Sequence, residues 1–259
     1  KAVYENQDDF NLNQEQKMLL KETYKAFVRG GANLPEDKKA EFREINKQLS
    51  LLSIEFGENI LKEDNKFELV IEKEEDLAGL PEHVIVAAAE AAKERGHEGK
   101  WVITLHKPSF IPFLQFSEKR DLREKVLTAY INRGNNNDEL DNKETLKQMV
   151  NLRLKRANLL GYDNHAAYIL EENMAKNSDN VYDLLTQIWK PALKKAKRER
   201  ADMQAMIDAE GHSFELQPWD WWYYAEKVKK QKYELDEESL KPYFQLENVR
   251  KGAFMVANK

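Results

Sequence analysis

The sequence predicts a mainly α-helical protein, a bundle of long helices with one small β element. Three observations favour this fold class. Apolar residues recur at helical spacing over most of the 259 residues, charged residues make up 34% of the chain, and only two short runs favour strands. A helix packed in a bundle buries one apolar side and exposes a charged one, so long amphipathic helices account for both the charge and the apolar content.

Residues 13–62 are predicted to form a hairpin of two helices. Asn13 can cap the first helix, with Gln16 three residues on as in a capping box, and a Gly-Gly pair ends it. The second helix begins near Pro35, a favourable first-turn residue. Its apolar residues then alternate in steps of three and four, the spacing of a helix packed lengthwise on a neighbour: Phe42, Ile45, Leu49, Leu52 and Phe56.

The small β element is expected near residues 67–71 (FELVI) and 101–105 (WVITL), on either side of an Ala-rich helix over 81–95. After the string SFIPFLQF the chain is predicted to be helical nearly to its end. The expected helices cover residues 119–133, 142–160, 164–172, 178–209 (kinked at Pro191) and 219–232, with a loop over 133–138.

A local metal site is not predicted. HEGKW, residues 97–101, opens like the zinc-peptidase motif H-E-x-x-H, but Trp101 stands in place of the second histidine and the segment falls in an expected loop. No two histidines are three or four residues apart, so each is interpreted as a surface or capping residue rather than a ligand: His83, His97, His106, His165 and His212. NNNDELDNKE has calcium-type oxygen ligands but lacks the glycine of the sharp turn.

Two conspicuous strings have a structural and a functional interpretation. The basic run 194–200 is read as the solvated side of a helix whose buried side carries Leu185, Ile188, Trp189 and Leu193, with a nucleic-acid patch as the alternative. The aromatic run 218–224 (PWDWWYY) is read as a buried helix start with Asp220 near the helix dipole, with a peptide-binding wall as the alternative.

Composition narrows the classes of protein further. The net charge of −5 argues against a nucleic-acid partner, and no apolar stretch reaches the roughly 18 residues of a membrane span. The chain has no cysteine. A cytoplasmic location is expected, with the periplasm as the alternative. The last apolar stripe runs to Lys259 without a helix terminator, which indicates either a cut polypeptide or a frayed terminus.

Strings spread over the whole chain resemble one family. They are FVRGGANL (residues 27–34), GKWVITLHKPSFIPFLQFSEKRDLREK (99–125), AYINRGNNN (129–137), NLRLKRANLLGY (151–162) and PWDWWYYAEKVKKQKYELDEESLKPYFQLENV (218–249). They resemble the bacterial peptidyl-dipeptidases (dipeptidyl carboxypeptidases) of the thimet-oligopeptidase-like zinc metallopeptidases. The last string resembles that branch more closely than the oligoendopeptidase branches.

The resemblance implies a nearly all-helical ellipsoid with a deep narrow channel and a zinc ion near its floor. In such a family two histidines of an H-E-x-x-H helix and a glutamate from a later helix hold the zinc, downstream of the segment matched here. Residues 1–259 would then be the helical N-terminal portion, one wall of the channel. The resemblance places no catalytic and no metal-binding residue in this chain, and it assigns no substrate-binding residue.

The implied parent enzyme releases dipeptides from the C-terminus of oligopeptides. Its partners would be short unstructured peptides and the missing C-terminal catalytic portion, with no nucleic acid. Zinc is expected in the full-length enzyme and not in this chain, which alone is expected to be inactive. The alternative is a stand-alone helical protein-binding module that uses residues 13–62 as its partner surface.

Overall fold

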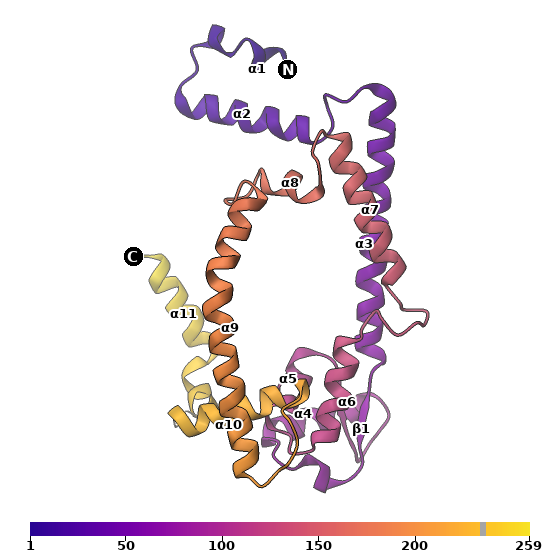
Figure 1. The fold of residues 1–259 in the computed structure, drawn as a ribbon, viewed down its shortest axis with the longest axis vertical. Helices are drawn as coiled ribbons and strands as arrows, with labels where there is room; N and C mark the ends of the chain where they lie inside the picture. Colours follow the sequence, from indigo (N-terminus) through magenta and orange to yellow (C-terminus); the bar gives the residue numbers. More distant parts are fainter. Residues whose placement is uncertain (234–236) are drawn as a thin grey trace. The chain divides into compact units, whose positions relative to one another are not determined.

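The protein is mainly α-helical with a single two-stranded sheet in its described residues, as predicted (Figure 1). The computed structural model describes residues 1–233 and 237–259. Residues 234–236, inside the string that resembles the peptidyl-dipeptidases, lie outside the described residues. The chain divides into two compact units, one of residues 1–63 and 133–190 and one of residues 64–132 and 191–259.

In the described residues of the first unit, helices are connected by loops and turns, and there is no strand. Its elements are α1 (Ala2–Glu5), a 3-10 helix (Gln7–Phe10), α2 (Gln14–Arg29), most of α3 (Glu36–Lys66), α7 (Lys143–Leu159), α8 (His165–Leu170) and the first part of α9 (Ser178–Ala209). The expected capping box begins α2: the Gln16 backbone N–H donates to Asn13 Oδ1 at 2.9 Å, and the Asn13 N–H donates to Gln16 Oε1 at 3.0 Å.

Helices α3 and α7 form the core of the first unit. Ile45 and Leu49 from α3 and Met149 from α7 are buried against one another. The heptad-like stripe of α3 is therefore packed lengthwise on a neighbour, as its spacing predicts. In the segment between α2 and α3, Gly31 has φ +87° and lies against the ring of Phe42. The hairpin over residues 13–62 stays a prediction.

Loop 133–142 is anchored to α3 by buried polar groups. The Glu63 carboxylate accepts hydrogen bonds from the Gly134 N–H and the Asn136 side chain. Asn59 donates to Asn142 Oδ1 at 3.0 Å, and Asn142 donates to the Phe56 carbonyl at 3.1 Å. A buried polar group is stable only when it is hydrogen-bonded, so these contacts fix the loop that the sequence predicted.

The oxygen-rich part of this loop surrounds a lysine. Lys143 Nζ donates to Asn135 Oδ1 at 3.1 Å, to Asn137 Oδ1 at 2.8 Å and to Asp141 Oδ2 at 2.6 Å. The side-chain ammonium thus occupies the centre of the oxygen ligands that suggested calcium.

The second unit contains the sheet and the larger core. Its elements are β1 (Leu69–Ile71), a 3-10 turn (Glu74–Leu77), α4 (Glu82–Glu94), β2 (Trp101–Ile103), α5 (Lys107–Phe116), α6 (Arg120–Ile131), the rest of α9, a 3-10 turn (Pro218–Asp220), α10 (Trp221–Tyr233), a 3-10 helix (Glu237–Phe244) and α11 (Leu246–Ala257). Strands β1 and β2 pair antiparallel, with Leu69 opposite Ile103 and Ile71 opposite Trp101. The predicted small sheet is confirmed.

Helix α5 was not predicted. It covers all of SFIPFLQF (residues 109–116), in which apolar residues follow one another around Pro112, so the string shows no clear helical periodicity. Phe110, Phe113 and Leu114 are almost fully buried in the core of the second unit. Ile111, Pro112, Gln115 and Phe116 are partly buried and Lys107 and Pro108 are exposed, so the helix packs on the core by one side.

The predicted buried side of α9 is exposed in this structure. Leu185, Ile188, Trp189 and Leu193 are all exposed, so the prediction that they are buried is wrong for this chain. The first buried residue of the helix is Met203, which joins a cluster with Ile207 and Tyr224. Helical spacing predicted an apolar side correctly but could not say whether this chain covers it. In the described part of the chain, no helix is both long and apolar enough to cross a membrane.

Candidate functional site

The four histidines of the second unit contact neighbouring side chains, cap a helix or lie exposed. In the second unit His97 contacts Glu68 Oε2 at 3.0 Å, and His212 stacks on Phe214. His106 precedes α5 as its N-cap residue, and His83 is exposed on α4. Within residues 1–233 and 237–259, no group of three or more His, Asp or Glu side chains is placed to hold a metal ion.

His165 lies in the first unit, at the start of α8. Burial lowers the pKa of its imidazole, and the charges of Arg156 and Arg153 lower that pKa further. Its Nδ1 is buried and has no hydrogen-bond partner in the described part of the chain. A neutral imidazole could act as a metal ligand, but the carboxylates and histidines that would complete a site are not beside it.

HEGKW, the string that suggested half a zinc motif, forms a turn. His97 lies between the end of α4 and the start of β2, and its backbone N–H donates to the Ala92 carbonyl at 2.8 Å. The segment is not helical, so it cannot present two ligands on one helix side as H-E-x-x-H does.

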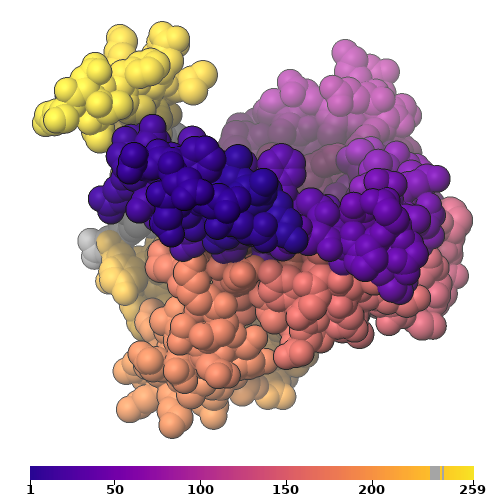
Figure 2. Space-filling view, turned by 90° about the horizontal axis from the view of Figure 1, so that it is seen from above, coloured from indigo at the N-terminus to yellow at the C-terminus, as the bar shows by residue number. Residues whose placement is uncertain are grey.

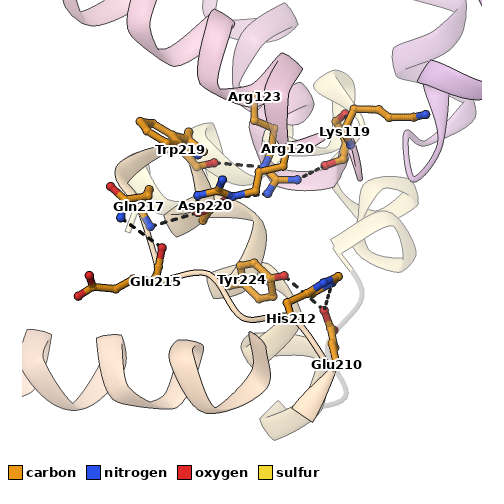
Figure 3. Close-up of polar contacts among 11 residues, drawn as sticks. Lys119, Arg120, Arg123, Glu210, His212, Glu215, Gln217, Trp219, Asp220 and Tyr224 are labelled. Atoms are coloured by element: carbon orange, nitrogen blue, oxygen red, sulfur yellow. Dashed lines mark hydrogen bonds and ion pairs between the residues drawn. The ribbon is translucent and has the colours of Figure 1, made fainter. Parts of the chain in front are cut away.

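The most strongly buried polar group of the second unit is a cluster of Arg120, Arg123, Gln217 and Asp220, the Asp220 cluster (Figure 3). Arg120 and Arg123 are three residues apart on α6, which places both guanidinium groups on one side of the helix. Asp220 ends the 3-10 turn that leads into α10, and it is fully buried.

Every lone-pair direction of the Asp220 carboxylate is used. Arg120 donates from Nε to Oδ1 at 3.0 Å and from its terminal nitrogen to Oδ2 at 2.9 Å, and Arg123 donates to Oδ1 at 2.8 Å. The Gln217 backbone N–H donates to Oδ2 at 3.1 Å, which closes the turn before α10. Arg123 also donates to the carbonyls of Ser117 and Trp219, at 2.7 and 3.2 Å.

Aromatic rings cover the two cations. The Arg120 guanidinium lies over Phe214 at 4.2 Å from the ring centroid and over Trp219 at 5.4 Å. The Arg123 guanidinium lies over Tyr223 at 4.2 Å. Such contacts stabilise a desolvated cation by roughly 0.5–2 kcal/mol each. The aromatic run PWDWWYY is therefore a helix start that is buried only in part: Asp220 and Tyr224 are buried, whereas Pro218 and Trp222 are exposed.

A second polar group is formed by Tyr224 and Lys227 of α10 and by Glu210, which follows α9. The Lys227 ammonium and the Tyr224 hydroxyl both reach the Glu210 carboxylate, at 2.5 and 3.4 Å. Burial raises the pKa of the Tyr224 phenol, and the negative charge of Glu210 raises it further. The phenol is therefore protonated at neutral pH and acts as a donor rather than a base.

The Asp220 cluster holds α6 and the start of α10 together. The Asp220 carboxylate is saturated by donors, the arginines have no acceptor, and no hydroxyl or thiol nucleophile is activated nearby. Sequence analysis placed Asp220 correctly at a helix start but did not find its partners. The only signal in the sequence was the Arg-x-x-Arg spacing on α6.

The chain belongs to Peptidase family M3, whose sequence model matches residues 113–259, more than half of its length. It is 35% identical to the dipeptidyl carboxypeptidase of Escherichia coli strain K12, over all of this chain and 38% of that protein. It is 34% identical to oligopeptidase A of the same strain, over 96% of this chain and 37% of that protein. It is also 34% identical to organellar oligopeptidase A of Arabidopsis thaliana, over 99% of this chain and 33% of that protein.

The chain thus spans about a third to two-fifths of the length of these relatives. The recognition of the family from its dispersed strings is confirmed. Members of the family are zinc metallopeptidases, yet the residues described here do not form a zinc site.

Proposed function

We propose that this chain is the non-catalytic N-terminal portion of a zinc metallopeptidase that releases dipeptides from the C-terminus of oligopeptides. The observation that carries the proposal is the match to relatives along the whole of this chain and only 33–38% of theirs. The Asp220 cluster supports a structural part for this segment, because it fixes the start of α10 to α6. No zinc ligand, base or oxyanion donor is assigned to this chain.

The part that this segment plays is that of a channel wall. A narrow channel admits unfolded peptides and excludes folded proteins, because threading a folded domain would cost its unfolding free energy, roughly 5–15 kcal/mol. A rigid wall also holds the peptide in the orientation that the reacting centre needs. The Asp220 cluster supplies rigidity of this kind within the second unit by tying α6 to the start of α10.

The relatives carry two different names. Dipeptidyl carboxypeptidase and oligopeptidase A are similar to this chain at 35% and 34% identity. The string over residues 218–249 favours the first. We therefore expect successive dipeptides to be released from the carboxyl end of a ten-residue peptide, whereas an endopeptidase would release larger internal pieces first.

The experiment compares this chain with the whole product of its gene. Each is supplied with zinc and an acetylated tetrapeptide, and the release of the C-terminal dipeptide is followed by chromatography. The whole product should cleave the peptide and a chelator should abolish cleavage, while this chain alone should not cleave it. Chelator-sensitive cleavage by the purified chain would contradict the proposal, provided that a mock purification shows no peptidase.

The alternative function is a stand-alone helical module that binds a protein through residues 13–62. The gene sequence distinguishes it from the peptidase. A reading frame that continues past Lys259 into an H-E-x-x-H motif supports the peptidase. A natural stop codon after Lys259 supports the module. The cytoplasmic location, with the periplasm as the alternative, stays a prediction.

A further inference from the structure

The first half of α9 carries an apolar side with no cover in the structure. Every residue from Tyr182 to Lys190 is exposed. The exposed fractions of the large apolar side chains are 68% for Tyr182, 57% for Leu184, 54% for Leu185, 52% for Ile188 and 66% for Trp189. In Figure 2, which looks from above, atoms of the orange segment that includes the start of α9 are visible at the surface.

These side chains share one side of the helix. Successive residues of an α-helix are rotated by about 100°, so positions 181, 184, 185, 188 and 189 fall within about half of its circumference. Asp183, Gln187 and Lys190 lie on the opposite side. The helix is therefore amphipathic, and its apolar side is exposed to solvent as well as its polar side.

Helix α4 shows what the same spacing does when a partner is present. Its apolar stripe of Val84, Ala88 and Ala92 is 4%, 4% and 0% exposed, because it packs in the core beside β2. The stripe of α9 contains larger side chains and would gain more from burial. Several large, exposed apolar side chains on one side of a helix are typical of a surface that another surface covers.

The occupant follows from the comparison with the relatives. They align with this chain from end to end, and more than half of each relative has no counterpart in it. We propose that the apolar side of α9 from Val181 to Trp189 is a docking surface for an apolar, helical surface of the remaining part of a longer M3 polypeptide. This inference rests on the proposed function, because both require that remaining part.

The absence of cysteine in this chain gives a direct test. Ile188→Cys places a thiol on the docking surface, and Gln187→Cys places a matched thiol on the polar side one residue away. Both variants are made in the whole gene product, and reaction with a maleimide is followed at each position by peptide mass spectrometry, in native buffer and in urea. We expect the thiol of the native Ile188→Cys variant to react at least about tenfold more slowly than that of the native Gln187→Cys variant, with equal rates in urea.

Each other outcome overturns the proposal. Equal native rates would mean that the surface stays open. Protection that disappears on dilution would mean that a second copy of the chain covers it. A gene that ends at Lys259 would leave no remaining part to dock. Leu185→Cys repeats the measurement at a second position on the surface, so that a local effect of one substitution does not decide the result.

Peptide hydrolysis, measured on the same preparations, separates the two proposals. An active peptidase whose thiol at position 188 reacts rapidly would keep the proposed function and remove the docking surface. A protected thiol at that position, in a protein that does not release dipeptides, would keep the docking surface and remove the proposed function.

Discussion

At the scale of single residues, the arrangement around Asp220 decides where α10 begins. Its carboxylate accepts from the Gln217 N–H at the start of the turn and from two arginines of α6. The burial of Asp220 and Arg123 is tolerated because both find hydrogen-bond partners, and aromatic rings lie over Arg123 and over the partly exposed Arg120. The cluster thus connects α6 to the turn before α10, two elements that are about a hundred residues apart in the chain.

Removing the carboxylate should be costly. Asp220→Ala leaves the Arg123 guanidinium, which is 1% exposed, without its counter-charge. Breaking a buried pair from one side destabilises a protein by roughly 3–5 kcal/mol, and we expect a loss of that size in urea unfolding followed by circular dichroism. Asp121→Ala on the same helix is the control, since its exposed pair with Lys125 is worth less than about 1 kcal/mol. Equal losses in the two variants would contradict the structural role of the cluster.

Asp220 also shows how far the sequence could lead at this scale. The letters Pro-Trp-Asp before an aromatic run predicted a helix start and an acidic residue at its N-terminal end. The partners, Arg120 and Arg123, could not be predicted. Nothing in local spacing connects residues so far apart, and a surface salt bridge on α6 would have given the same letters.

Lys143, the first residue of α7, makes a prediction about pH. The hydrogen bond from the Lys143 ammonium, followed by the one from its backbone N–H, lowers the pKa of Asp141 from its ordinary 3.8 to about 2. A depressed pKa in the folded protein adds stability above pH 3.8 that is lost as the pH falls toward 2. Lys143→Met should raise the pKa toward 3.8 in a carboxyl-detected NMR titration. Lys147→Met, whose partner is Glu144, should leave it unchanged.

At the scale of elements, helices with caps and a clear period were predicted closely, and the exceptions have physical reasons. Helix α5 shows no clear period because apolar residues follow one another around Pro112, although only Phe110, Phe113 and Leu114 are buried, and α9 has a period whose apolar side this structure leaves open. Periodicity predicts that the apolar side of a helix must be covered. Which element covers it depends on the tertiary or quaternary structure. The two strands were found because their β-favouring residues stand out from the helical background.

The turn before α4 makes a prediction at this scale. Gly79 has φ +86°, and a Cβ there would lie 2.2 Å from the Phe116 carbonyl oxygen. Gly79→Ala should therefore add an overpacking cost of about 1–3 kcal/mol to the left-handed strain of about 1–2 kcal/mol. Gly96 is the matched control, because it has φ +80° and no atom within 4 Å of the added Cβ. Thermal unfolding of the two alanine variants should show the larger loss at Gly79, and similar losses would mean that the close approach is relieved at no cost.

At the scale of the whole molecule, the chain has cores of unequal size. The second unit buries side chains from its sheet and from α4, α5 and α6 in one continuous cluster. The largest buried cluster of the first unit lies between α3 and α7, and its part of α9 is exposed. The proposed docking of α9 accounts for this inequality, because it assigns part of the apolar area of the first unit to a contact outside this chain.

The unequal cores predict that the units of this chain open separately. Local opening occurs at lower free energy where fewer apolar contacts are buried, so backbone amides of α2 and α7 should exchange with solvent at lower urea concentrations than those of α4 and β2. Ala92 and Val102, both fully buried in the second unit, should be among the last to exchange. Native-state hydrogen exchange read by mass spectrometry at increasing urea measures the order. A single urea dependence shared by α7 and β2 would show that the two cores unfold as one cooperative structure, and the difference in buried area would then not govern stability within this chain.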